Sequence, residues 1–261
     1  MMVRKGKKAL FAIVEGDSDS HFFFDELQKK CRDEHILIKA YDGDIFTDYS
    51  KMDIPIRDRI RAFFVERMGE LRVSDFLGIL HLTDTDGAFV SDDKVIVDLN
   101  QQEKIIYSVN GIFVNSAEQQ EKMQRRNQQK KSQTAAARFI SNITYNKIEI
   151  PYRLFYLSQH LEHVVFDELN VPGNEKIKKI IKFIKEQAAP NSIESLLNNH
   201  FPQLPVLTES KHKESWDFIF QGDNSLQRYT NAELMYGYLE ELLKIKEEKV
   251  KKSDSPTVNS E

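Results

Sequence analysis

Short apolar runs alternate with segments of helical periodicity along the first third of the chain. Lys8–Val14, His35–Ala40 and Phe76–Leu82 are apolar runs of strand length, and we predict a buried strand at each. Between the second and third strands, Ile56–Leu71 carries apolar residues at helical spacing, and another helix is predicted to lead from the first strand to Cys31. Strands that alternate with helices indicate an α/β fold with a mostly parallel sheet and right-handed crossovers.

The pattern becomes less regular after Gly87, and most of the later elements are predicted to be helices. The predicted strands are Lys104–Tyr107, Gly111–Val114 and Ile148–Leu157. A long, Gln-rich and basic helix is predicted at Glu118–Asn142. Further helices are predicted from Ser158 to Leu169 and at Asn174–Gln187, Ser192–His200, Ser215–Gln221 and Asn231–Val250. The last of these is apolar on one side, so we expect it to close the core or to form a contact in a homo-oligomer.

Composition limits where the protein can work. With 40% hydrophobic residues among 261, the chain can build a sizeable core, yet no apolar run approaches the roughly 20 residues that span a bilayer. The apolar stretch after Met1–Lys8 meets Glu15 and Asp17 too soon to serve as a signal-peptide core. The single cysteine, Cys31, excludes an internal disulfide framework and a cysteine-based zinc site. We therefore expect a cytoplasmic protein without a membrane partner.

Charge points to one segment as a contact for nucleic acid. The net charge is −4, so nucleic acid would have to be bound locally and not by the molecule as a whole. The balance reverses from Lys122 to Arg138, where basic residues occur without an acidic one. The residues that we expect to contact phosphate are Lys122, Arg125, Arg126, Lys130 and Lys131.

Two acidic motifs each follow a predicted strand. Glu15 and Asp19 follow the first strand, and Asp84 and Asp86 follow the third. Because sites in open α/β sheets form outside the carboxyl ends of the strands, we expect these side chains to meet and to bind Mg²⁺. Asp84 and Asp86 should point to one side if the backbone remains extended. The alternative is structural, with Asp19 as a helix N-cap and the other two aspartates as turn formers before Gly87.

In these two motifs the chain resembles the Toprim superfamily, and within it the nucleases of the overcoming-lysogenisation-defect (OLD) family and related phage-defence proteins. The family pattern is a strand-terminal Glu, often in Glu-Gly-x-x-Asp, with Asp-x-Asp on a later strand, and it covers about residues 8–165 here. OLD-like nucleases place a further Glu after another strand, and Glu162 is the matching position. The residue two positions before that Glu is Ser in the family and His160 in this chain. The resemblance implies one or two Mg²⁺ or Mn²⁺ ions held by Glu15, Asp19, Asp84, Asp86 and Glu162.

The resemblance also implies a catalytic lysine and a domain organisation. OLD-like nucleases carry a downstream Lys that stabilises charge in the transition state, and Lys211 and Lys213 lie where it could be, although a solvated basic loop is the alternative. OLD proteins join their Toprim domain to an ATPase; no Gly-x-x-x-x-Gly-Lys-Ser/Thr motif occurs here, so a separate ATPase subunit is the implied partner. The expected organisation is a Toprim-like metal-binding domain at 1–170 with a basic helical insertion at about 117–142, a helical C-terminal region at 171–250 and a disordered tail at 251–261.

The leading hypothesis is a Mg²⁺- or Mn²⁺-dependent endonuclease that hydrolyses phosphodiester bonds in DNA or RNA. Glu15 would act as ligand or general base, with Asp84 and Asp86 as main ligands and Asp19 and Glu162 completing the site. A role in bacterial defence against phage is implied by the resemblance alone. The rival hypothesis is a non-catalytic Toprim-like interaction or sensor module that acts with a partner such as an ATPase. The sequence leaves open the number of metal ions and the choice between DNA and RNA.

Overall fold

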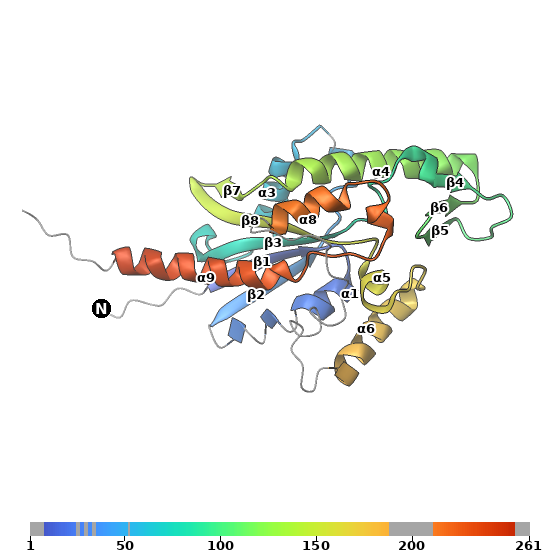
Figure 1. The fold of residues 1–261 in the computed structure, drawn as a ribbon. Helices are drawn as coiled ribbons and strands as arrows, with labels where there is room; N and C mark the ends of the chain where they lie inside the picture. Colours follow the sequence, from blue (N-terminus) through green and yellow to red (C-terminus); the bar gives the residue numbers. More distant parts are fainter. Residues whose placement is uncertain are drawn as a thin grey trace, which may run out of the picture.

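A five-stranded sheet forms the centre of the protein (Figure 1). The computed structural model describes residues 8–24, 27–28, 31–32, 35–51, 53–187 and 211–253. The strand order is β2 (Ile36–Asp42), β1 (Lys8–Val14), β3 (Phe76–Asp84), β8 (Ile148–Leu157) and β7 (Asn142–Tyr145). β2, β1, β3 and β8 are parallel, and β7 is antiparallel to β8. The carboxyl ends of β1, β3 and β8 therefore lie at the same edge of the sheet.

Helices cover both faces of this sheet, which explains why β1 is apolar at every position after Lys8. Side chains along β1 alternate between two hydrophobic clusters, so that Leu10 joins the first and Phe11 the second. The first cluster is covered by the helical turn η1 (Ser20–Phe24), α5 (Leu161–Phe166), α6 (Gly173–Gln187) and α9 (Leu234–Ser253). The second is covered by α3 (Ile56–Arg67) and α8 (Lys211–Ile219), with α4 (Ala117–Ala137) on the same side of the sheet (Figure 1).

Three short strands form a second, smaller sheet. Its order is β4 (Val95–Val97), β6 (Gly111–Val114) and β5 (Ile105–Ser108). Met123 of α4 packs against this sheet in a small cluster that Leu226 completes. The small sheet lies beside one end of α4 in Figure 1. It therefore supports the long helix from which the basic side chains project.

The structure confirms the predicted α/β architecture, with a mostly parallel sheet flanked by helices. The short strands β4 and β7 are not among the predicted elements, and α4 ends at Ala137, earlier than predicted, because the chain turns to enter β7. The tail predicted from residue 251 begins as helix, since α9 continues to Ser253. The predicted helix at Ser192–His200 and the tail residues 254–261 lie outside the described residues. Over the described ranges, no helix has both the length and the apolar character needed to cross a membrane.

The described C-terminal helices pack on the sheet. Trp216 of α8 is buried in the second cluster, and Leu242 of α9 is buried in the first. Gly78 of β3 lies directly beneath α9, where an added Cβ would be 2.8 Å from Leu242 Cδ1. α8 and α9 thus share their hydrophobic cores with the strands that carry the acidic motifs.

Candidate metal centre

The parallel strands bring three acidic loops to one edge of the sheet. β1 ends one residue before Glu15, and its neighbour β3 ends at Asp84. β8 pairs with the other side of β3, with Leu157 opposite Asp84, and leads to Glu162 at the start of α5. The expectation that the two motifs lie on neighbouring strand ends is confirmed. Side chains from three separate segments can therefore reach one space.

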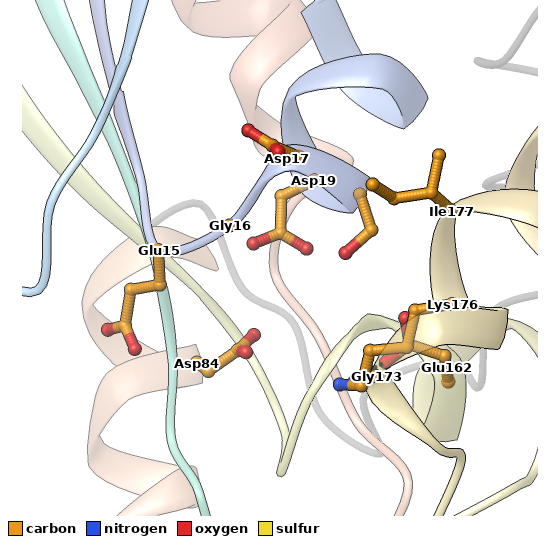
Figure 2. A pocket seen from close by; sticks show the side chains of 10 residues that line it. Glu15, Gly16, Asp17, Asp19, Asp84, Glu162, Gly173, Lys176 and Ile177 are labelled. Atoms are coloured by element: carbon orange, nitrogen blue, oxygen red, sulfur yellow. Dashed lines mark hydrogen bonds and ion pairs between the residues drawn. The ribbon is translucent and has the colours of Figure 1, made fainter.

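That space is a cavity of about 290 Å³. Its acidic lining includes Glu15, Asp19, Asp84 and Glu162, and Lys176 of α6 contributes a basic side chain. In Figure 2 the carboxylates of Asp19 and Asp84 point into the space between the strand ends and α6. Glu162 and Lys176 lie on the opposite wall, while the Glu15 carboxylate bends away from Asp19. The cavity thus has the acidic lining that a divalent cation requires.

Asp19 is buried and does not cap a helix. It is the last residue of the short helix α1 (Asp17–Asp19), whose N-cap is Gly16 and has no side-chain cap, so the N-cap interpretation of Asp19 is wrong. Burial, followed by the negative charges of Glu162 and Glu15, raises the pKa of Asp19 to about 8. The positive charge of Lys176 and then a hydrogen bond with the Gly16 backbone oppose this rise only in part. The Asp19 carboxylate is therefore costly to ionise unless a cation enters the cavity.

Asp84 and Glu162 each present an oxygen atom without a hydrogen-bond partner. Asp84 Oδ1 is buried and unpaired, and burial together with the charges of Asp19 and Glu15 raises its pKa well above the ordinary value. Glu162 Oε2 accepts from Lys176 Nζ at 2.9 Å and lies 3.1 Å from His160 Nδ1, whereas Oε1 is buried and unpaired. Although burial raises the pKa of Glu162, the bonds from His160 and Lys176 lower it to about 2. Glu162 is thus ionised, oriented and left with one free oxygen.

Asp86 lies away from the lining of the cavity. The backbone leaves the extended conformation after Asp84, because Asp86 and Gly87 both have positive φ angles, of 49° and 64°. The two aspartates therefore do not share one side as an extended backbone would require. Asp86 instead forms ion pairs with Arg126 and Lys130. Burial alone would raise the pKa of Asp86, but these two cations hold it well below its usual range.

Glu15 is held between two donors. Its Oε1 accepts a hydrogen bond from the Thr83 hydroxyl, and its Oε2 accepts from Lys130 Nζ at 2.8 Å. Burial raises the pKa of Glu15 to about 7, while the positive charge of Lys130 opposes that rise. Lys130 itself is fully buried, with 0% of its side chain exposed. It therefore cannot contact a phosphate in solution, in contrast to the prediction that the basic residues of this helix bind nucleic acid from its surface.

The other predicted basic residues differ from one another in their surroundings. Arg125 is exposed on α4, and Lys122 forms an exposed ion pair with Glu118. Lys131 donates to the Phe89 carbonyl at 2.7 Å. Arg125 and Lys122 are therefore the basic residues of α4 best placed to reach phosphate groups.

Lys211 and Lys213 are not brought to the acidic cavity. They line a different cavity of about 580 Å³, together with Arg153 of β8 and Glu241 of α9. Sequence reasoning missed the lysine that does line the acidic cavity, Lys176. Nothing in the Lys-rich sequence of α6 distinguishes Lys176 from its neighbours. The contribution of Thr83 could have been found, because it lies one residue before Asp84 at the end of a buried strand.

The donor set fits a hard divalent cation better than zinc. Within the described ranges, no three His, Cys, Asp or Glu side chains lie close enough together to hold a metal ion as they stand. The unpaired Asp84 and Glu162 oxygens and the mutual repulsion of Asp19 and Asp84 nevertheless leave negative charge for which a cation would compensate. Carboxylate oxygens with room for water are the surroundings that Mg²⁺ and Mn²⁺ prefer. Asp19, Asp84 and Glu162 line the cavity and are therefore the residues that would have to draw together to hold such an ion.

Comparison with known proteins assigns no family to the chain. No protein-family model, no curated protein sequence and no solved structure matches it. The case for a function therefore rests on the acidic cavity and on the two motifs that form it.

Proposed function

We propose that this protein is a Mg²⁺- or Mn²⁺-dependent endonuclease that hydrolyses phosphodiester bonds in DNA or RNA. The observation that carries the proposal is the cavity at the carboxyl ends of β1, β3 and β8, which is lined by Asp84 and Glu162, each with a buried carboxylate oxygen that has no hydrogen-bond partner. The resemblance of the two acidic motifs to Toprim nucleases supplies the reaction class. A separate ATPase subunit and a role in phage defence are further expectations from that resemblance.

Each residue of the cavity has a defined task in this proposal. A divalent ion held by Asp19, Asp84 and Glu162 would polarise the scissile phosphate and lower the pKa of an attacking water. Glu15, which is held by Thr83 and Lys130, would accept a proton from that water. Lys176 takes the place that the sequence assigned to Lys211 or Lys213, because its ammonium group lies on the cavity wall and can offset negative charge on the phosphate.

Cleavage assays test this proposal directly. The purified full chain is incubated with plasmid, single-stranded DNA and total RNA, with Mn²⁺ or with chelator. We expect Mn²⁺-dependent cleavage by the wild type, and its loss in Asp84→Ala and in Glu15→Ala. Asp53→Ala, at an exposed position, is the matched control and should cleave like the wild type.

The rival hypothesis, a non-catalytic interaction module, predicts no Mn²⁺-dependent cleavage in this assay. A non-catalytic interaction module would bind its partner equally well with Mn²⁺ or with chelator. If both cavity variants cut nucleic acid at the wild-type rate, the nuclease proposal is wrong. Circular dichroism of each variant shows whether a loss of cleavage follows from unfolding.

A further inference from the structure

A lysine from the long helix is built into the acidic site. Lys130 projects from α4, is fully buried, and bonds to Glu15 Oε2 at 2.8 Å and to Asp86. Arg126, one helical turn earlier, forms the second ion pair of Asp86. A buried ammonium group is costly without partners, and Lys130 has carboxylates from two different strand ends. It thus joins the loop after β1 to the loop after β3.

This arrangement divides the acidic residues into two groups. Glu15 and Asp86 are each paired with a cation from α4. Among the described residues, Asp19 and Asp84 form no ion pair. Glu162 is paired with Lys176 but retains the unpaired Oε1 atom. On one side of the site two cations, Arg126 and Lys130, face two carboxylates, whereas on the other side Lys176 is the one cation described beside the three carboxylates of Asp19, Asp84 and Glu162.

We propose that Lys130 is a positioning residue that serves as a fixed internal cation: it holds Glu15 in place and, with Arg126, removes Asp86 from the set of metal ligands. The divalent ion is then bound by Asp19, Asp84 and Glu162 alone. This inference rests on the proposed function, since it assigns roles within the same site. It differs from the sequence-based expectation in three residues, because Glu15 and Asp86 bind Lys130 instead of metal and Lys130 binds carboxylates instead of phosphate.

Binding of Mn²⁺ to the purified full chain, measured by isothermal titration calorimetry, tests the division of the aspartates. Asp84→Asn should weaken Mn²⁺ binding by more than about tenfold, the scale on which the loss of groups around a metal acts. Asp86→Asn, two residues away, should weaken it far less. Lys130→Met should tighten Mn²⁺ binding, because a positive charge beside the ion has been removed. A purely structural role for Lys130 would instead weaken it.

Kinetics separate positioning from contact with the substrate. Lys130→Met should lower kcat and leave KM for nucleic acid unchanged, because the buried ammonium group cannot reach the substrate. Arg125→Glu, an exposed change on the same helix, should raise KM and leave kcat unchanged. An increase in KM for Lys130→Met with an unchanged kcat would make Lys130 a phosphate contact and overturn the inference.

The outcomes distinguish this inference from the proposed function. If Asp86→Asn loses Mn²⁺ affinity as severely as Asp84→Asn, Asp86 is a ligand and the inference is wrong, while the nuclease proposal stands. If the wild type binds no Mn²⁺, both are wrong. Lys130→Met could fail to fold because it leaves Glu15 without its cation; the comparison of the two aspartate variants then decides the question by itself.

Discussion

The buried carboxylate of Asp19 should make the metal-free protein less stable as the pH rises. The pKa of Asp19 is raised from an ordinary value of 3.8 to about 8, first by burial and then by Glu162 and Glu15. Below about pH 4 this carboxyl group is protonated in both the folded and the unfolded chain. Between about pH 4 and pH 8 the unfolded chain releases the proton and the folded chain retains it, so the free energy of unfolding falls with pH. Asp19→Asn removes the part of this dependence that comes from Asp19, while the parts from Glu15 and Asp84 remain.

The size of the effect follows from the shift in pKa. Since one pKa unit corresponds to about 1.4 kcal/mol, the wild type should lose on the order of 5 kcal/mol relative to Asp19→Asn by pH 8, and about 1.5 kcal/mol by pH 5. For a chain of this size, the larger value corresponds to roughly 10–20 °C in Tm. The variant should therefore melt well above the wild type at pH 8 in chelator, and only slightly above it at pH 5.

Thermal and urea denaturation at both pH values measure this difference. Asp53→Asn, at an exposed position, is the matched control and should follow the wild type at each pH. Saturating Mn²⁺ should stabilise the wild type through mass action and the variant less, so the gap at pH 8 should narrow. Two results would refute the raised pKa of Asp19. One is a stability difference between wild type and Asp19→Asn that does not change with pH, and the other is a variant less stable than the wild type at pH 8.

Two further predictions concern the packing of the C-terminal helices. Gly78→Ala should lower the free energy of unfolding by about 1–3 kcal/mol, because a Cβ there would lie 2.8 Å from Leu242 Cδ1 and 3.2 Å from the Pro151 carbonyl oxygen; urea denaturation measures this. Trp216→Ala should cost about 3–5 kcal/mol in the same assay, since the indole ring is buried and its N–H donates to the Leu154 carbonyl at 3.1 Å. A loss below 1 kcal/mol, on the scale of a typical surface substitution, would show that α8 is not part of the core.

The strand framework was predictable because a strand that is buried on both faces has a continuous run of apolar residues in the sequence. β1 is apolar at each position from Ala9 to Val14 since helices cover both of its sides. The parallel order of such strands then requires that the residues after them meet at one edge, which placed Glu15 beside the loop of Asp84. β4 escaped prediction because it has only three residues, and a strand of that length has too few positions for a periodicity to appear.

The division of the acidic site was not predictable from the pattern of charges. The expectation that Asp84 and Asp86 share one side assumed an extended backbone, and the positive φ of Asp86 depends on the turn that Gly87 completes. Lys130 lies in a Gln-rich, basic helix, where a lysine is typically solvated. Its burial is decided by the packing of α4 across the strand ends, a contact between segments more than a hundred residues apart.

Two aspartates that are two residues apart therefore have opposite electrostatic surroundings. The positive charges of Lys130 and Arg126 lower the pKa of Asp86. Burial and the negative charges of Asp19 and Glu15 raise the pKa of Asp84. A permanent positive charge from α4 keeps Asp86 ionised whether or not a metal is present. With a pKa of about 8, Asp19 is mostly protonated at neutral pH in the absence of a further cation, so a divalent ion that binds to its carboxylate must displace a proton. Occupancy of the cavity therefore depends on pH through Asp19, whereas Asp86 takes no part in this dependence.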